Sequence, residues 1–278
     1  MLFRPAACAF LLIGSAQAQQ CPSLVAEDPA FARVIALTGK AQRNELRRLM
    51  ATDNQRGFIN SVFYYGERLR PALLSLVADR DHAGYAVELL ALIGEPEDLR
   101  RIIKSPPRAG RDALSFRWAY QVASSLLDPS SEEDWSFLRR CALHEYENPW
   151  ADTGAIQTLK LIASPRAREI LEEAQNKNTF QQRSLSNPLQ YIDSNPAALA
   201  GMDLISLSER IAQTISPVTW KGNGMPRCNE KQDQALINFN FETDEDLYFY
   251  SATFHKTSDA WKLRGLRETA QALKMHRP

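Results

Sequence analysis

The chain has 278 residues, of which 44% are hydrophobic and 24% are charged, with 33 basic residues against 33 acidic ones. This length is enough for two ordinary domains, each with a core of its own. A chain without net charge has no overall field that would steer it to nucleic acid or to an anionic membrane. We therefore expect no nucleic-acid partner.

Residues 1–18 have the pattern of a secretory signal peptide. MLFRPAACAFLLIGSAQAQQ places Arg4 before a short apolar run, and Ala16 and Ala18 form an A-x-A cleavage site. Cleavage after Ala18 predicts a periplasmic or secreted protein. Two alternatives stay open, an uncleaved anchor and a lipoprotein modified at Cys21, although Gln20 stands where a lipoprotein has a small residue. No later stretch has the length of a membrane-spanning helix, so we expect no membrane span.

Three cysteines remain after such a cleavage: Cys21, Cys141 and Cys228. An oxidising compartment would allow one disulfide and one thiol. Cys141 lies in a strongly helical stretch, where a buried thiol is the more common outcome. The pattern favours a Cys21–Cys228 disulfide, and the two other pairings stay open.

Residues 27–178 show a helical pattern with short breaks at Gly, Asp or Pro. LIGEP, LLDP and LIASP begin at Leu92, Leu126 and Leu161, which is a nearly constant spacing. The expected second helices of the repeats are RNELRRLMA, RPALLSLVA, PEDLRRIIK, SEEDWSFLRRCAL and PRAREILEEA. Because one helix pair cannot bury its apolar face alone, the pattern predicts stacked hairpins.

The starts of three second helices carry capping signals. Glu95, Ser131 and Ser164 are the expected N-caps, and Pro96 and Pro165 follow two of them at the first helical position. These signals set the expected boundaries of the second helices.

ALIGEPEDLRRII and KLIASPRAREILEEA resemble the HEAT-like helical repeat family. The resemblance covers most of the N-terminal part and implies an α-solenoid that binds other proteins along a curved surface, often with its second helices. The predicted fold is mainly α: an α-solenoid of about five helical hairpins over 19–178, a linker at 179–187, and a smaller α+β domain with an antiparallel sheet over 188–278.

Paired arginines recur on three of the expected second helices, in ELRRLM, DLRRII and FLRRCA. Aligned by stacking, they would form a surface suited to carboxylate or phosphate, because the guanidinium group is a planar fork of donors. The alternative is that Glu45, Asp98 and Asp134 pair with these arginines inside or between repeats. The candidate partner-binding residues are Arg47, Arg48, Arg100, Arg101, Arg139 and Arg140.

The C-terminal part changes from helical to alternating periodicity. QALINFNF, LYFYSATFHK and AWKLRGLRE alternate in the manner of strands in an antiparallel meander. A first strand is expected around VTWKG, and KGNGMPR is expected to be a loop. The aromatic Trp261 after a polar turn gives this part a resemblance to nuclear transport factor 2-like or cystatin-like α+β domains. That superfamily includes enzymes and binding modules alike, so the resemblance does not decide the function.

No catalytic or metal-binding motif appears in the chain. The four histidines lack metal-ligand spacing, and we expect no cofactor. We predict an exported, non-enzymatic protein-binding module, of an immunity or scaffold type, whose partner is another envelope or secreted protein. The competing hypothesis is a small-ligand or enzymatic pocket on the sheet, near Tyr248, Tyr250, His255 and Trp261, and its own alternative is that these aromatic residues form the core.

Overall fold

The computed structural model places most of the predicted elements. It describes residues 29–52, 55–107, 117–146, 151–162, 164–177, 204, 206–207, 220–223, 226–242, 246–257 and 260–273. The predicted signal peptide, Cys21 and the predicted linker at 179–187 lie outside these residues. The described part is mainly helical and carries a small antiparallel sheet, as predicted.

The helices of the described part form five consecutive pairs, and the two members of each pair are in contact. Their bounds are α1 (Pro29–Ala36), α2 (Gly39–Thr52), α3 (Gln55–Tyr64), α4 (Gly66–Leu76), α5 (Ala83–Ile93), α6 (Pro96–Lys104), α7 (Arg117–Ser125), α8 (Glu132–Ala142), α9 (Ala151–Ile162) and α10 (Pro165–Asn176). Each second member (α2, α4, α6, α8 and α10) overlaps one of the five segments that the sequence pattern predicts, although α2 and α4 begin four residues earlier than predicted.

The second helices begin where their capping residues require. Ser131 Oγ accepts a hydrogen bond from the Asp134 amide at 3.2 Å, and Ser164 Oγ accepts one from the Ala167 amide at 3.2 Å. Glu95 is the N-cap residue of α6, and the Asp98 side chain accepts a hydrogen bond from the Glu95 amide at 2.9 Å. These bonds satisfy amides that would otherwise lack a partner at the helix start, so the predicted N-caps are confirmed.

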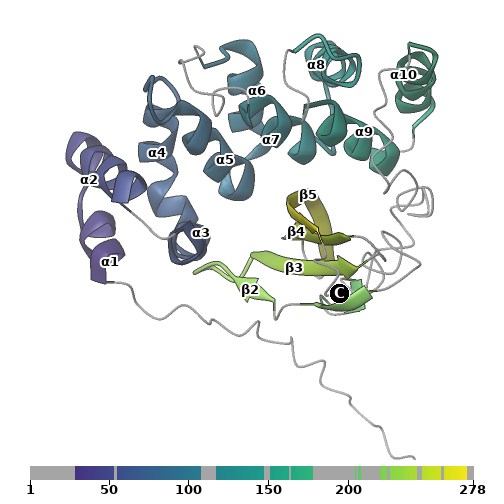
Figure 1. Cartoon of the computed structure of the whole chain (residues 1–278). Helices are drawn as coiled ribbons and strands as arrows, with labels where there is room; N and C mark the ends of the chain where they lie inside the picture. The colour runs from purple at the N-terminus through teal and green to yellow at the C-terminus, as the bar shows by residue number, and fades with distance from the viewer. Residues whose placement is uncertain are drawn as a thin grey trace, which may run out of the picture.

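Neighbouring helix pairs pack on one another in two layers. In the inner layer α5 packs on α7 and α7 on α9, while in the outer layer α6 packs on α8 and α8 on α10. Two hydroxyls connect successive inner helices: Ser125 Oγ donates to the Ala91 carbonyl at 3.3 Å, and Thr158 Oγ1 donates to the Ala123 carbonyl at 2.6 Å. Figure 1 shows the helices arranged in an arc around one side of the sheet.

The sheet has the strand order β1-β3-β4-β5, and β2 also pairs with β3. The strands are β1 (Trp220–Asn223), β2 (Arg227–Cys228), β3 (Gln234–Glu242), β4 (Asp246–Thr257) and β5 (Ala260–Leu273), and every pairing is antiparallel. The predicted meander is therefore confirmed. The loop predicted at KGNGMPR is wrong in part, because both of its ends form strand residues that pair with β3.

The two faces of the sheet bury different residues. One face carries an apolar cluster that includes Phe239, Tyr250 and Phe254, together with Leu204 and Leu207 from the segment before β1. On the other face Leu236 belongs to the core of the helices. Because side chains alternate along a strand, the sheet contributes to two separate apolar cores.

The sheet lies against the inner layer of helices, where β5 packs on α7 and α9 (Figure 1). Arg267 Nη1 on β5 donates to Gln121 Oε1 on α7 at 2.8 Å, and both side chains are buried. The turn between β2 and β3 reaches α3, where the Glu230 amide donates to the Tyr64 carbonyl at 2.9 Å. The inner side of the arc is thus occupied by the chain's own sheet.

The two cysteines in the described residues, Cys141 and Cys228, are in different chemical states. Cys228 is disulfide-bonded, whereas Cys141 is a thiol buried in the helical core. The two pairings that use Cys141 are therefore excluded. The partner of Cys228 lies outside the described residues, so the Cys21–Cys228 disulfide stays a prediction.

Candidate functional site

The six arginines singled out in the sequence lie on second helices of the helix pairs: α2, α6 and α8. Five of the six form ion pairs. Arg48 binds Glu45 one turn away in α2, with its Nη2 2.7 Å from Oε1, and Arg140 Nε lies 3.4 Å from Glu145 Oε2. The Arg140 guanidinium also lies 4.6 Å from the centre of the Tyr146 ring. These two arginines are held within their own helix pair.

The other three reach an acidic residue that follows later in the chain, near or in the next helix pair. Arg47 Nη1 lies 3.4 Å from Asp79 Oδ2, and Arg100 Nε lies 3.2 Å from Asp134 Oδ2. Arg139 binds both carboxylate oxygens of Glu173, with Nε 2.8 Å from Oε2 and Nη2 2.5 Å from Oε1. Two further ion pairs connect successive helix pairs: Arg70 binds Asp98, which follows it in the chain, and Arg166 binds Glu132, which precedes it. We call these five ion pairs the arginine ladder.

The arginine ladder shifts the pKa values of groups that form it. Hydrogen bonds from Arg139 and Lys177 hold the pKa of Glu173 below its ordinary value. Burial raises the pKa of Asp79, but the hydrogen bonds from His82 and the Asp81 amide and the charge of Arg47 outweigh it, so the net shift is downward. Both carboxylates therefore stay ionised, and able to bind arginine, at lower pH than an isolated carboxylate.

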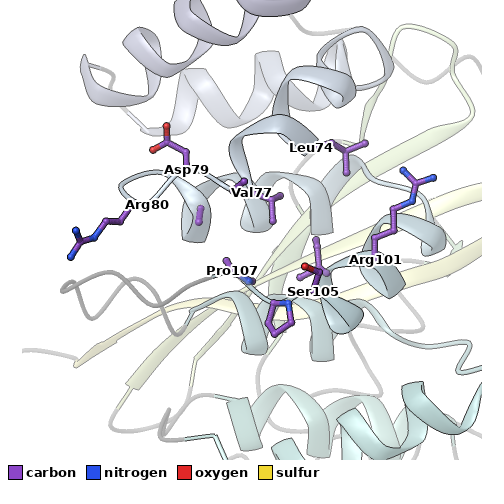
Figure 2. A pocket seen from close by; sticks show the side chains of 11 residues that line it. Leu74, Val77, Asp79, Arg80, Arg101, Ser105 and Pro107 are labelled. Atoms are coloured by element: carbon purple, nitrogen blue, oxygen red, sulfur yellow. The ribbon is translucent and has the colours of Figure 1, made fainter.

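Arg101 differs from the other five, because it is exposed and has no ion pair with any described residue. It lines a surface hollow of about 870 Å³ between the C-terminal ends of α4 and α6. A second exposed arginine, Arg80, lies on the opposite side of the hollow from Arg101 (Figure 2). Arg80 likewise has no ion pair within the described part of the chain. We call this surface the two-arginine hollow.

The rest of the two-arginine hollow is mostly apolar. Leu74 comes from the end of α4, and Pro107 comes from the segment that follows α6 (Figure 2). Among the described residues that line the hollow, the one acidic side chain is Asp79, which is already bound to Arg47 and to His82, whose Nδ1 lies 3.0 Å from Asp79 Oδ1. The hollow thus combines an apolar lining with two cations that lack acidic partners among the described residues.

A smaller hollow of about 300 Å³ lies between α8 and α10. Its lining includes half-buried Trp135 and two pairs of the arginine ladder, Arg139 with Glu173 and Arg166 with Glu132. The Arg166 guanidinium lies 5.0 Å from the centre of the Trp135 ring. Because these arginines are already paired with carboxylates, this hollow offers less to a charged ligand than the two-arginine hollow does.

The structure separates the residues of the predicted sheet pocket. Tyr250 is 2% exposed and belongs to the apolar cluster of the sheet, and Trp261 packs against the same cluster. His255 follows Phe254 of that cluster on β4, so it points to the opposite face. Tyr248 pairs with Phe241 on β3, and its side chain lies outside the described residues. Tyr250 and Trp261 therefore contribute to a core, and His255 is not brought beside them.

Two classes of site have no counterpart in the described part of the chain. No cluster of histidine, cysteine and acidic side chains there is arranged to hold a metal ion. Among the described helices, none is long and apolar enough to cross a membrane.

Comparison with known proteins adds no family: no protein-family model, curated protein or solved structure matches the chain. The candidate site therefore rests on geometry. Sequence reasoning singled out Arg101 but missed Arg80 and Pro107, which lie outside the recurring Leu-Arg-Arg pattern. The one sequence signal for this site was the Pro-Pro pair after α6, because paired prolines mark a turn or loop rather than a helix.

Proposed function

We propose that this chain is an exported, non-enzymatic protein-binding module, built as a HEAT-like α-solenoid of five hairpins with an α+β sheet docked on it. Its partner is another envelope or secreted protein, and an immunity or scaffold role fits this class. The observation that carries the proposal is the two-arginine hollow, where Arg80 and Arg101 lie beside an apolar surface without a matching described carboxylate.

The solenoid arrangement is supported by interactions that recur at one repeat length. The ion pairs of Arg100 with Asp134, Arg139 with Glu173, and Arg166 with Glu132 each join residues 34 positions apart. A regular offset of this kind is expected where equivalent positions of successive repeats stack on one another.

The outer layer is the better candidate for the binding surface. On the inner side of the arc α7 and α9 are in contact with β5, so a partner would have to displace the sheet. Along the outer layer the arginine ladder pairs most of the arginines internally, which leaves them little to offer a partner. The two-arginine hollow has both apolar surface to bury and charge to match.

Photo-crosslinking from Ser105 tests this assignment. Ser105 is exposed and lines the two-arginine hollow, so a benzoylphenylalanine side chain placed there would contact a bound partner. After irradiation of the full chain in an envelope extract of the source organism, we expect an adduct between the chain and a second protein. Mass spectrometry would identify that protein.

The same photoreactive residue at Glu172 is the control, because Glu172 is exposed on α10, away from the two-arginine hollow. We expect no adduct from this position. Equal adducts from both positions would indicate non-specific contact and count against the proposal, as would the absence of any adduct from Ser105.

A further inference from the structure

We propose that the two-arginine hollow recognises a segment of the partner polypeptide in which a carboxylate side chain lies next to aliphatic side chains. This inference rests on the proposed function and specifies the chemistry that the partner must have. Three observations carry it: the apolar lining of the hollow, the absence of described acidic partners for its two arginines, and the acidic side chain next to Arg80.

The lining selects aliphatic side chains. Leu74, Val77, Ala83, Ile102 and Pro107 carry no side-chain donor or acceptor. A polar group placed against these residues would lose its hydrogen bonds to water, whereas a side chain the size of leucine or valine would gain from burial. The occupant must therefore present apolar side chains to this part of the hollow.

The two arginines select a carboxylate. Arg80 and Arg101 come from different elements, the turn after α4 and the last turn of α6, and lie on opposite sides of the hollow (Figure 2). A guanidinium binds a carboxylate through two parallel hydrogen bonds. Asp79 does not fill this role, because Arg47 and His82 already bind it.

A structural reason accounts for only one of these arginines. Arg101 lies in the last turn of α6, where a cation is favourable to the helix dipole. That reason does not extend to Arg80, which lies in the turn between α4 and α5. Figure 2 shows the two side chains extending away from each other at the two ends of the apolar surface, so a ligand long enough to span the hollow is needed to reach both.

The acidic side chain next to Arg80 disfavours a polyanion such as nucleic acid. Asp81 follows Arg80 directly in the chain; its side chain is 72% exposed, and its Oδ2 lies 3.9 Å from Arg47 Nη2. Binding a nucleic-acid backbone requires a continuous basic surface that neutralises several phosphates. A polypeptide segment with one or two carboxylates needs only two cations and no continuous basic surface, so a protein partner is favoured.

Selection from a random decapeptide display library tests the inference with the full chain as bait. We expect the enriched peptides to carry aspartate or glutamate next to leucine, isoleucine or valine. A fluorescein-labelled synthetic copy of the most enriched peptide would then be titrated against three proteins: the native chain, the double variant R80E/R101E and the double variant R33E/R168E. Circular dichroism would show that all three retain their helical content.

The two variants make the same change in net charge at different places. Arg33 and Arg168 are exposed on α1 and α10, outside the two-arginine hollow. We expect R80E/R101E to weaken peptide binding about tenfold or more, since the peptide carboxylate would lose its charge-assisted hydrogen bonds and meet two negative charges instead. We expect R33E/R168E to change it less than about twofold, because distant exposed charges are screened.

The outcomes separate this inference from the proposed function. Enrichment of basic or purely apolar peptides, no enrichment at all, or binding that R80E/R101E retains would each overturn the inference. If Ser105 nevertheless crosslinks to a partner protein, the protein-binding function stands and only the recognition chemistry is wrong. If neither experiment gives binding, both proposals fail.

Discussion

Replacing Asp98 with alanine should lower the free energy of unfolding by about 3 kcal/mol. The Asp98 side chain is fully buried, and it accepts hydrogen bonds from Arg70 Nε at 2.6 Å and Nη2 at 2.9 Å. It also accepts a hydrogen bond from the Glu95 amide at the start of α6. Alanine would leave the Arg70 guanidinium and this amide without their carboxylate.

The expected loss of unfolding free energy in Asp98→Ala is moderated because its partner Arg70 is partly exposed to water. Breaking a fully buried ion pair costs roughly 3–5 kcal/mol, and loss of a helix cap costs roughly 0.5–2 kcal/mol. The Arg70 side chain is 31% exposed, so water would replace part of what it loses. We therefore expect a value slightly below the sum of the two lower limits.

Urea denaturation followed by circular dichroism would measure the change, with Glu97→Ala as the control. Glu97 lies beside Asp98 in α6 and its Oε1 lies 2.6 Å from Arg100 Nη1, but its side chain is 68% exposed. An exposed ion pair contributes about 0–1 kcal/mol, so E97A should be nearly neutral. If D98A were no more destabilising than E97A, the Arg70–Asp98 ion pair would not hold its two helix pairs together.

Replacing Gly154 with valine should destabilise the chain by about 3 kcal/mol, because α9 and α7 approach each other closely at this residue. A Cβ atom at Gly154 would lie 2.6 Å from Ser124 Oγ, 2.9 Å from Tyr120 Cδ2 and 3.0 Å from the Tyr120 carbonyl oxygen. The carbonyl belongs to the α7 backbone, so it can move only if the helix moves. Valine would place this Cβ atom and two further methyl groups in the contact.

Gly154→Ala tests the sign of the change in unfolding free energy, measured by the same urea denaturation. In an open helix, alanine is more favourable than glycine by about 1 kcal/mol. In the close contact between α7 and α9 the added Cβ should instead destabilise, by less than valine does. Stabilisation by G154A would contradict the close packing of these two helices.

Local features of this fold could be predicted from the sequence. Ser131 and Ser164 set the starts of α8 and α10 through hydrogen bonds to amides within one turn, and such bonds depend only on neighbouring residues. The alternation in β3 and β4 likewise follows from which residues share a face of a strand. Mainly helical structure with a small antiparallel sheet was therefore predictable.

Contacts between distant segments could not be predicted in the same way. Arg267 and Gln121 are far apart in the chain, and no local pattern indicates that β5 packs on α7. The two-residue strand β2 is too short to show alternation, so the sequence pattern places it in a loop. Its pairing with β3 depends on the register of the folded sheet.

The candidate site was predictable only in part, for the same reason. Arginine pairs identified the second helices, but the partner of each arginine depends on how the helix pairs stack. The sequence pattern pairs Asp98 with an arginine of a Leu-Arg-Arg segment, but Asp98 binds Arg70 of α4 instead. Arg80 belongs to no repeat pattern, and only the fold brings it to the same hollow as Arg101.

The central claim, that the two-arginine hollow binds a partner protein, is tested most directly by affinity capture with charge-matched baits. The baits are the native chain, R80E/R101E and R33E/R168E, each incubated with the same envelope extract, and the retained proteins are quantified by mass spectrometry. We predict one protein that the native chain and R33E/R168E retain equally and that R80E/R101E loses. Equal retention by all three baits, or loss from both variants alike, would contradict the assignment of the binding site to this hollow.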